Sequence, residues 1–363
     1  MRRLPSRIAL SRNDVGVSTM GILGVTREFA AALWAPLGGD VNTSAHDGTP
    51  PASTAERSGA SRPASGDVAM SVVIACYNGE STLGMQLDAL ARQVDAPPFE
   101  VVVADNNSTD GSAALARSYA DRLDVRVVDA SAVKGPGHAR NVGVAAARSD
   151  YIAFCDADDE VADDWLASAY AALDGGLQFV AGRFDVEKLN SEAIRRSRST
   201  EQQEGLQRSA VGVGLTHAGA GNMAFRRAGF EAVDGFDESL RCLQDSDLCW
   251  RMQLAGTPLD FVPAMLIHTR LRSTLQGMVR QGYLYGRSFA QLEGRYGTGE
   301  EPAPQASPEA SGPLAAVRAR VRKAADLGLG GVLWHTAWHI GHRVGKRGVA
   351  RAAQLPAAHR QAA

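Results

Sequence analysis

The chain has few cysteines and no long apolar run, and each shortage excludes a class of protein. Its four cysteines lack CxxC spacing, so we expect reduced thiols in a cytoplasmic protein rather than a zinc ribbon or a disulfide framework. No apolar run reaches the roughly 18–20 residues that span a bilayer. The N-terminal stretch MRRLPSRIALSRNDVG has neither the apolar centre nor the cleavage site of a signal peptide.

Two common nucleotide-binding signatures are also missing. The sequence contains no GxxxxGK[ST], which argues against a P-loop, and GxGxxG does not follow the first predicted strand, which argues against a redox Rossmann domain. The formal net charge is −2, so the whole-molecule charge gives no reason to expect nucleic acid as a partner.

Composition divides the chain into four parts. Residues 1–69 are expected to be poorly ordered, because 37–69 are rich in Gly, Ser, Ala, Pro and Thr and cannot bury enough apolar surface to offset chain entropy. Residues 70–297 have the pattern of a folded domain. Residues 298–312, TGEEPAPQASPEASG, are interpreted as a linker, and residues 313–363 as a basic helical tail.

Short apolar runs alternate with amphipathic segments in the first half of the domain, residues 70–160. The run SVVIACYN predicts a strand that is covered on both faces. Leu83, Leu87, Leu90 and Val94, three or four apart, predict a helix after it. The alternation predicts an α/β fold with a mostly parallel central sheet and helices on both faces. The strands are expected at 71–78, 99–106, 125–130 and 151–158.

The alternation is looser in the second half, residues 161–297. A helix containing Trp165 leads to a strand at 177–185, and polar residues 187–210 are expected to form a mobile loop. A strand at 259–270 and a helix at 274–293 are expected to close the domain.

Polar side chains follow several of the predicted strands. In open α/β sheets, ligands bind beyond the carboxyl ends of the strands, so one pocket could collect these groups. Asp156 and Asp158 could together bind a hard divalent cation whose shell is completed by phosphate oxygens. The alternative is a solvated acidic turn that caps the next helix. The strand-end residues are Asn78, Asp105, Asp156, Asp158 and His268.

Four ordered motifs resemble those of the family 2 glycosyltransferases, which have the GT-A fold and use nucleotide-diphospho-sugars. They are SVVIACYNGESTL, EVVVADNNSTDGS, GPGHARNVGVAAARSDYIAFCDADD and LQDSDLCWR, and the resemblance covers roughly residues 71–295. It implies an inverting, metal-dependent transferase, with 70–160 as the nucleotide-binding half and 161–297 as the acceptor half.

The resemblance implies roles for the donor side by position. Asp105 matches the contact to the nucleotide base, although this chain has DNNSTD where the family has DDGSTD. Arg140, together with Asn78, is expected near the nucleotide. Asp156 matches the acid that approaches the ribose, and Asp158 matches the ligand of Mg²⁺ or Mn²⁺. An Asx-turn for Asp105 and a helix-surface position for Arg140 remain the structural alternatives.

The resemblance also implies roles around the acceptor. Asp245, in QDSD, matches the general base, and a helix N-cap is its structural alternative. His268 matches a histidine that completes the metal shell, or is a structural residue. Asn222, in GAGNMAFRR, is expected on the acceptor side. Asp159 and Glu160 match no catalytic position and are expected in a solvated turn.

The basic tail contains Trp334 and Trp338 with three histidines near Arg343 and Lys346. A basic helix with aromatic residues suits an anionic membrane surface, so peripheral contact with the inner face of the membrane is one interpretation. The other is a helix that packs on the catalytic domain.

These inferences predict a hexosyltransferase of cell-envelope or exopolysaccharide synthesis. Its donor would be a UDP-, dTDP- or GDP-sugar and its acceptor a glycan or lipid-linked hydroxyl. One alternative is an inactive nucleotide-sugar-binding module. Another is a sugar nucleotidyltransferase, although CYNGEST stands where that class has a GxGxR/K loop.

Overall fold

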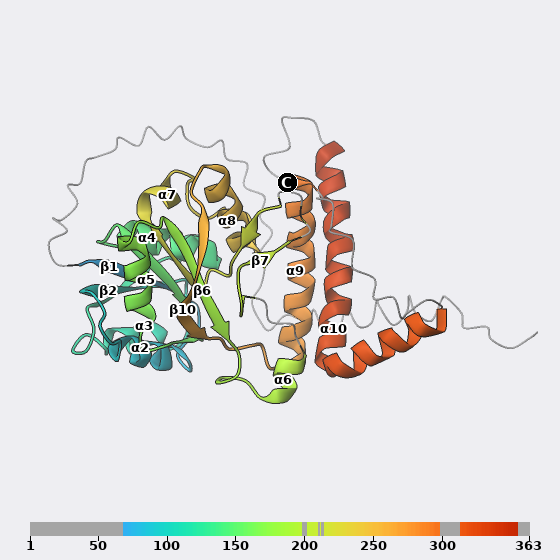
Figure 1. Ribbon diagram of the computed structural model, residues 1–363, viewed down its shortest axis with the longest axis horizontal. Helices are drawn as coiled ribbons and strands as arrows, with labels where there is room; N and C mark the ends of the chain where they lie inside the picture. The colour runs from blue at the N-terminus through green and yellow to red at the C-terminus, as the bar shows by residue number, and fades with distance from the viewer. Residues whose placement is uncertain (1–67, 198–201, 210, 212–213, 298–312, 355–363) are drawn as a thin grey trace, which may run out of the picture. The chain divides into compact units, whose positions relative to one another are not determined.

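A computed structural model describes residues 68–197, 202–209, 211, 214–297 and 313–354 (Figure 1). The expectations for residues 1–67 and for the linker at 298–312 lie outside these ranges. Side chains of the last helix are described between residues 327 and 350. Within the described ranges, no helix has the length and apolarity needed to cross a membrane.

The first half follows the predicted alternation closely. Its strands are β1 (Met70–Cys76), β2 (Phe99–Asp105), β3 (Val125–Asp129) and β4 (Tyr151–Asp156), and they pair in parallel in the order β3-β2-β1-β4. The helices between them are α2 (Leu83–Ala91), α3 (Ser112–Arg117) and α4 (Pro136–Ala146). Pro136 lies in the first turn of α4, where its missing N–H leaves no helical bond unmade.

The second half adds four strands to the same sheet, which continues as β9-β6-β10-β5 after β4. The strands β6 (Phe179–Asp185) and β10 (Leu259–His268) run parallel to each other, whereas β9 (Asn222–Arg226) and β5 (Glu160–Val161) are antiparallel to their neighbours. Its helices are α5 (Trp165–Asp174), α7 (Arg227–Glu231), α8 (Gln244–Leu254) and α9 (Leu275–Tyr296). The polar segment at 187–210 contains α6 (Glu192–Arg196) and β7 (Gln207–Arg208), which pairs with β8 (Thr216–His217).

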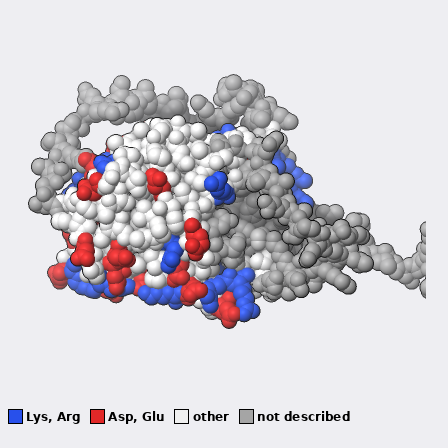
Figure 2. Space-filling model, in the orientation of Figure 1, with Lys and Arg blue, Asp and Glu red and all other residues white. Residues whose placement is uncertain are grey.

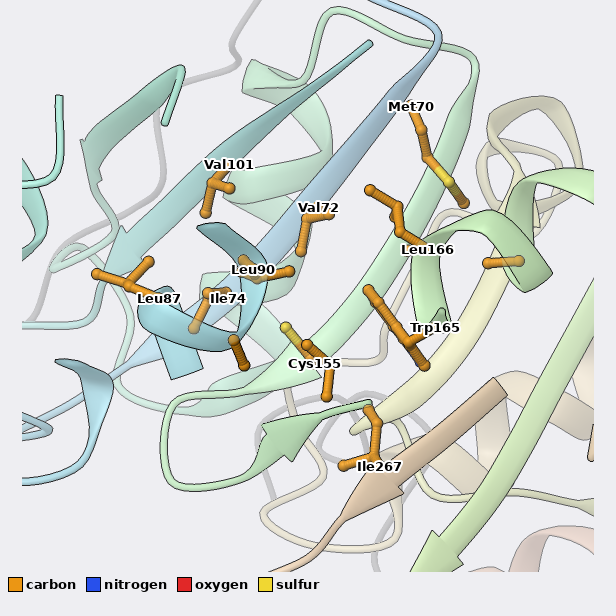
Figure 3. Close-up of a cluster of buried hydrophobic side chains, with 14 of the residues drawn as sticks. Met70, Val72, Ile74, Leu87, Leu90, Val101, Cys155, Trp165, Leu166 and Ile267 are labelled. Carbon is orange, nitrogen blue, oxygen red and sulfur yellow. The ribbon is translucent and has the colours of Figure 1, made fainter. Parts of the chain in front are cut away.

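The two faces of the sheet support separate apolar cores. On one face, Val72 and Ile74 of β1 pack with Leu87 of α2 and Trp165 of α5 (Figure 3). On the other face, Val73 of β1 belongs to a cluster with residues of α7 and α8. Successive strand residues point to opposite faces, so a continuous apolar run such as β1 supplies both cores.

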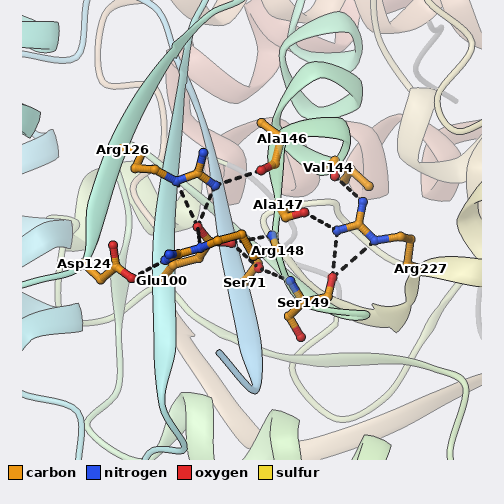
Figure 4. Close-up of polar contacts among 10 residues, drawn as sticks. All are labelled: Ser71, Glu100, Asp124, Arg126, Val144, Ala146, Ala147, Arg148, Ser149 and Arg227. Carbon is orange, nitrogen blue, oxygen red and sulfur yellow. Dashed lines mark hydrogen bonds and ion pairs between the residues drawn. The ribbon is translucent and has the colours of Figure 1, made fainter. Parts of the chain in front are cut away.

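A buried ionic cluster connects the beginnings of the central strands (Figure 4). Glu100 of β2 is fully buried and accepts hydrogen bonds from the Ser71 hydroxyl (2.7 Å), from Arg126 (2.6 Å) and from Arg148 (3.0 Å). Arg227 of α7 donates to carbonyl oxygens of Ala147 and Ser149 at the end of α4. These contacts stabilise the amino-terminal ends of the parallel strands, opposite the carboxyl ends.

The last helix, α10 (Pro313–Gln354), packs along α9, and a break at Gly328 (φ 63°) divides it into two segments. Glycines allow close approach of the two helices: a Cβ atom at Gly286 would lie 2.0 Å from the Trp338 carbonyl oxygen. Phe289 of α9 contacts both Trp338 and His342. These aromatic residues therefore belong to a helix interface, which agrees with the interpretation in which the tail packs on the domain.

Candidate active site

Strand register places the predicted strand-end residues on the same side of the sheet, where the parallel strands end. Asp105 pairs with Cys76 at the end of β1, and Asp156 pairs with Ala75. At the other end of the sheet, His268 lies between Asp185 of β6 and Glu160 of β5. All of them thus lie along the carboxyl ends of the parallel strands, as the sequence predicts, with four strands between β2 and β10.

Asn78 and Asp105 fix the loop that follows β2. The Oδ1 atom of Asn78 accepts from the backbone N–H of Thr109 (2.8 Å), and Asp105 Oδ1 accepts from the N–H of Ser108 (3.1 Å). Both carboxamide and carboxylate therefore shape the loop, and the Asp105 bond reaches the third residue on, so it closes a wider turn than the Asx-turn, which reaches the second. One oxygen suffices for that turn, so Asp105 keeps a second oxygen for a ligand.

The departure from the family pattern at Asn106 has a structural reason. The Asn106 side chain is buried, and its Nδ2 donates to the carbonyl oxygens of Ala130 and Val133 (2.8 Å to Val133). Its Oδ1 accepts from the N–H of Gly135 (2.8 Å). A carboxylate cannot donate, so this chain needs the amide to hold residues 130–135, which lead directly into α4.

Arg140 of α4 faces the strand end through an ion pair. Its Nη2 donates to Asp156 Oδ1 at 2.5 Å, and its guanidinium lies over the Phe236 ring, 5.6 Å from the centroid. The side chain is 9% exposed, so the helix-surface alternative is wrong. Its Nε is buried and has no hydrogen-bond partner among the described residues, which leaves a donor beside Asp156.

The acidic side chains after β4 repel one another, and a bound cation would reduce this repulsion. Burial, followed by repulsion from Asp156, raises the pKa of Asp158. Burial, followed by repulsion from Asp156 and Asp158, raises the pKa of Asp159 well above its ordinary value. Asp158 remains partly exposed, and among the described residues its carboxylate has a cationic partner only at 4.0 Å, in Arg272 Nη1.

The expectation that Asp159 and Glu160 lie in a solvated turn is wrong. Asp159 is 3% exposed and accepts from the backbone N–H of Arg270 at 2.8 Å. Glu160 is also buried and pairs with Arg92 and with Lys188 (2.9 Å). Burial raises the pKa of Glu160, but the Lys188 and Arg92 hydrogen bonds outweigh it and lower the pKa. Both acids therefore anchor the loop that presents Asp158.

His268 is oriented by a carboxylate. Its Nδ1 lies 2.6 Å from Asp185 Oδ2, and this pairing leaves Nε2 as the nitrogen that could meet a ligand. Metal-binding histidines commonly engage a carboxylate through their other nitrogen in this way. The pairing with Asp185 was not predicted. Asp185 ends its strand as the other site acids do, so its position was the available signal.

The donor set fits a hard divalent cation that takes part of its shell from substrate. Asp158 and His268 offer an oxygen and a nitrogen, but no three His, Cys, Asp or Glu side chains of the described residues converge on a common ligand position. Mg²⁺ often uses one or two carboxylates and completes its octahedron with phosphate oxygens and water. The raised pKa values of the partly exposed Asp158 and the buried Asp159 favour a cation at this loop.

A short glycine-rich segment connects the acids after β4 with Asp245 of α8. The backbone N–H of Ala220 donates to Asp245 Oδ2 (3.3 Å). A Cβ atom at Gly221 would lie 2.7 Å from Asp156 Oδ2. Asp156 and Asp245 therefore both lie against residues 219–221. Asp245 occupies the first turn of α8, as the sequence predicts.

Asn222 has a different role from the one expected. Its side chain is fully buried, with Oδ1 accepting from Trp165 Nε1 (2.8 Å) and Nδ2 donating to the carbonyls of Arg183 and Met265 (both 2.9 Å). The amide is engaged on both ends within the protein. Its position thus corrects the acceptor-side expectation: Asn222 connects β9 to α5, β6 and β10.

His217 is a site residue that the sequence does not reveal. Its Nδ1 lies 3.1 Å from Ser246 Oγ, and its ring stands edge-on against Trp250, 5.7 Å between centroids. Burial lowers the pKa of His217, while the nearby Asp245 carboxylate opposes that shift. The signal was weak because a lone histidine in a polar segment has no distinctive spacing.

The face of the molecule that is seen in Figure 2 carries mixed charge along its lower edge. In the view of Figure 2, Lys and Arg side chains alternate with Asp and Glu along the lower edge, where α2, α3 and α6 lie in Figure 1. The described part of this face has no broad basic field of the kind that attracts nucleic acid.

Comparisons with known proteins agree with this architecture. Residues 71–234 match the family model "Glycosyl transferase family 2". A pre-mycofactocin glycosyltransferase of Mycobacterium tuberculosis is 32% identical over 210 residues, covering 54% of this chain and 43% of that protein. The succinoglycan biosynthesis protein ExoO of Rhizobium meliloti is 35% identical over 124 residues, covering 34% of this chain and 35% of that protein. The chain thus spans less than half the length of these relatives.

Among solved structures, the mannosyltransferase PcManGT from Pyrobaculum calidifontis, in complex with GDP-Man and Mn²⁺, has a TM-score of 0.52 at 21% identity. The alignment covers 77% of this chain and 86% of that one. The similarity identifies the fold, and the predicted GT-A architecture with its mostly parallel sheet is confirmed. Residues 71–234, less than half of the chain, are identified by this match as a family 2 glycosyltransferase region.

Proposed function

We propose that this protein is an inverting, metal-dependent glycosyltransferase. It moves a hexose from a nucleotide-diphospho-sugar to a hydroxyl of a glycan or lipid-linked acceptor in cell-envelope or exopolysaccharide synthesis. The observation that carries the proposal is the 219–221 segment, which contacts Asp245 through Ala220 and closely approaches Asp156 at Gly221. A donor acid and a base that both lie against one short segment suit a single displacement.

The donor side uses residues from three strand ends. Asn78 and Asp105 would meet the nucleotide base, while Asp156 and Arg140 would meet the ribose and diphosphate. Arg140 supports this role because its buried Nε lacks a partner among the described residues. PcManGT binds GDP-Man with Mn²⁺, and Asp158 with His268 would hold Mg²⁺ or Mn²⁺ here. When bound, the cation offsets the charge of the diphosphate leaving group.

Asp245 would act as the general base. The acceptor hydroxyl oxygen forms a bond to the anomeric carbon as the bond from that carbon to the diphosphate oxygen breaks. The bonding pair leaves with the nucleoside diphosphate, and the hydroxyl proton passes to the Asp245 carboxylate. One displacement inverts the configuration at the anomeric carbon. The N–H groups of Ala220 and Ser246 orient the carboxylate for this transfer.

The experiment is a screen of UDP-, dTDP- and GDP-sugars for binding and hydrolysis, with and without Mn²⁺. It compares the wild type with Asp158→Ala and with Asp121→Asn, an exposed acid beyond α3 that serves as the control. We expect metal-dependent turnover of one donor, lost in Asp158→Ala and kept in the control. Binding without turnover of any donor, with acceptor glycans present, would instead support an inactive binding module. Absence of metal-dependent binding would overturn the proposal.

A further inference from the structure

The outer face of α10 is an apolar and basic surface without a partner in the described part of the chain. Leu329, Val332, Ile340 and Val344 are four of the ten exposed large apolar residues in the described ranges. Separations of three, eight and four residues place them on one side of the helix. We call these four residues the outer stripe.

The outer stripe lies opposite the side that packs on α9. Trp338, Gly341 and Gly345 face α9, where Cβ atoms at the two glycines would lie 2.0 and 2.8 Å from backbone oxygens of that helix. At 100° per residue, Ile340 is turned about 200° from Trp338. Packing on α9 therefore leaves the outer stripe uncovered rather than burying it.

The charges on this surface have one sign. Between residues 327 and 354 the sequence has no Asp or Glu but contains Arg343, Lys346, Arg347 and Arg351. Lys346 turns inward and pairs with Glu293 of α9 (3.4 Å). Arg343 and Arg347 fall within the angular range of the outer stripe, at its C-terminal end, and both are exposed.

This charge pattern indicates which kind of partner binds the outer stripe. In a symmetric pair of α10 helices, each Arg343 and Arg347 would meet either the same arginines or the apolar stripe of the other copy. In either arrangement, residues 327–354 of the other copy would supply no acid. A bilayer surface with anionic headgroups offers negative charge beside an apolar layer, and arginine stems can extend along that layer to the headgroups.

We propose that the outer stripe, with Arg343 and Arg347, docks α10 on an anionic lipid surface. The aromatic side of the helix, which the sequence suggested for this role, is instead packed on α9. Docking on lipid would bring the protein to a surface that presents a lipid-linked acceptor. Only this link to the acceptor rests on the proposed function. Lipid binding itself needs neither donor nor metal.

The test is co-sedimentation of the full chain with phosphatidylglycerol vesicles and with phosphatidylcholine vesicles, without donor or metal. We expect binding to the anionic vesicles at least about tenfold tighter than to the neutral ones, because each arginine near an anionic surface contributes. Added salt should weaken it. Ile340→Glu should lose at least about tenfold, whereas Leu254→Glu, at an exposed apolar residue of α8, should bind as the wild type does.

Three outcomes would overturn the proposal: no binding of the wild type, equal binding to both vesicles, or unchanged binding by Ile340→Glu. A wild-type dimer that Ile340→Glu converts to a monomer, without vesicle binding, would assign the stripe to a second copy instead. Circular dichroism and melting temperature verify that the variants fold. Donor turnover is measured separately, so failure at the membrane and failure of the proposed chemistry are distinguishable.

Discussion

Asp245 and Asp247 lie two residues apart in the first turn of α8 and have opposite surroundings. Asp247 is fully buried, and its carboxylate accepts from Arg251, Arg295 and the Tyr296 hydroxyl, each at 2.7 Å. Burial, followed by the bond to Asp247, raises the pKa of Tyr296 to about 12. Asp247 therefore fastens α8 to α9. Asp245 is half-buried and bonded to backbone N–H groups, so it keeps lone pairs for an incoming proton.

The substitution Asp245→Asn tests the role of this residue as base. The amide oxygen of the new side chain can still accept from Ala220, but it cannot take a proton from the acceptor, so we expect transfer to fall roughly 10²–10⁴-fold. Donor affinity should change little, since Asp245 lies on the acceptor side. Transfer rates and donor binding are measured beside Asp121→Asn. A variant that transfers sugar at the wild-type rate would remove Asp245 from the mechanism.

The substitution Gly221→Ala tests the close approach between residues 219–221 and the Asp156 carboxylate. A Cβ atom there would lie 2.7 Å from Asp156 Oδ2, so Gly221→Ala should displace this carboxylate and the Arg140 that pairs with it. We expect donor KM to rise roughly 10–100-fold. Gly205→Ala, where nothing lies within 4 Å, is the matched control. Equal KM values for the two variants would contradict this account of Gly221.

The substitution Asn106→Asp tests whether the asparagine that departs from the family pattern stabilises the fold. In Asn106→Asp, a carboxylate would face the carbonyls of Ala130 and Val133, so we expect a loss of about 1–3 kcal/mol in the free energy of unfolding. Asn107→Asp, at the adjacent exposed turn residue, should change stability much less. Urea titration of both variants measures the difference, and equal midpoints would refute the role of the amide.

At the scale of elements, the regular part of the fold was predictable and the interrupted part was not. The strands β1 to β4 are mostly apolar runs, and each parallel connection between them holds a helix. The strand β9 enters antiparallel between β4 and β6, and nothing in the local pattern of residues 222–226 encodes that direction. The two-residue strand β5 is too short for a periodic signal.

The site residues divide in the same way, into those that the sequence predicts and those that it does not. Asp156, Asp158 and Asp245 stand in recognisable motifs at element ends, so the sequence located them. Asn222 was misassigned because its partner Trp165 is 57 residues away in the chain and comes near it only through the order of the strands. Burial of Asp159 and Glu160 likewise depends on Arg270 and Lys188, which come from distant loops. Contacts of this range are set by tertiary packing.

The ionic cluster at Glu100 gives a pH-dependent prediction for β2. Burial alone raises the pKa of Glu100, but the bonds from Ser71, Arg148 and Arg126 outweigh it and lower the pKa. A carboxylate with a depressed folded pKa stabilises the protein above its unfolded pKa of about 4.3, and this contribution is lost as pH falls through the folded pKa.

Glu100→Gln should therefore destabilise the protein by about 3 kcal/mol at neutral pH, near the lower end for a broken buried pair, because both arginines keep access to water. The difference from wild type should shrink as pH falls below about 4. Glu192→Gln, in the exposed pair with Arg196, should have little effect. Urea titrations across pH provide the measurement, and a difference that stays constant with pH would argue against a charged Glu100.

At the scale of the whole molecule, α9 connects the catalytic domain to α10. The C-terminal half of α9 is held to α8 by Leu292 and Tyr296, which pack with Trp250. The pairing of α9 with α10 depends instead on glycines at 282, 286, 341 and 345, whose missing side chains let the backbones approach. Two interfaces of different chemistry thus meet on one helix, and they should be separable by mutation.

Gly286→Leu tests this separation. A side chain at position 286 would collide with the Trp338 carbonyl oxygen, 2.0 Å from the Cβ position, and overpacking of a tight contact costs about 1–3 kcal/mol. We expect faster amide hydrogen exchange throughout residues 329–350, while β1 to β4 and donor binding remain as in the wild type. Gly348→Leu, where nothing lies within 4 Å of the Cβ position, is the control on α10. If Gly286→Leu instead lowered protection in the central sheet or abolished donor binding, α10 would be part of the catalytic fold. Unchanged exchange in α10 would mean that the glycines do not govern the pairing.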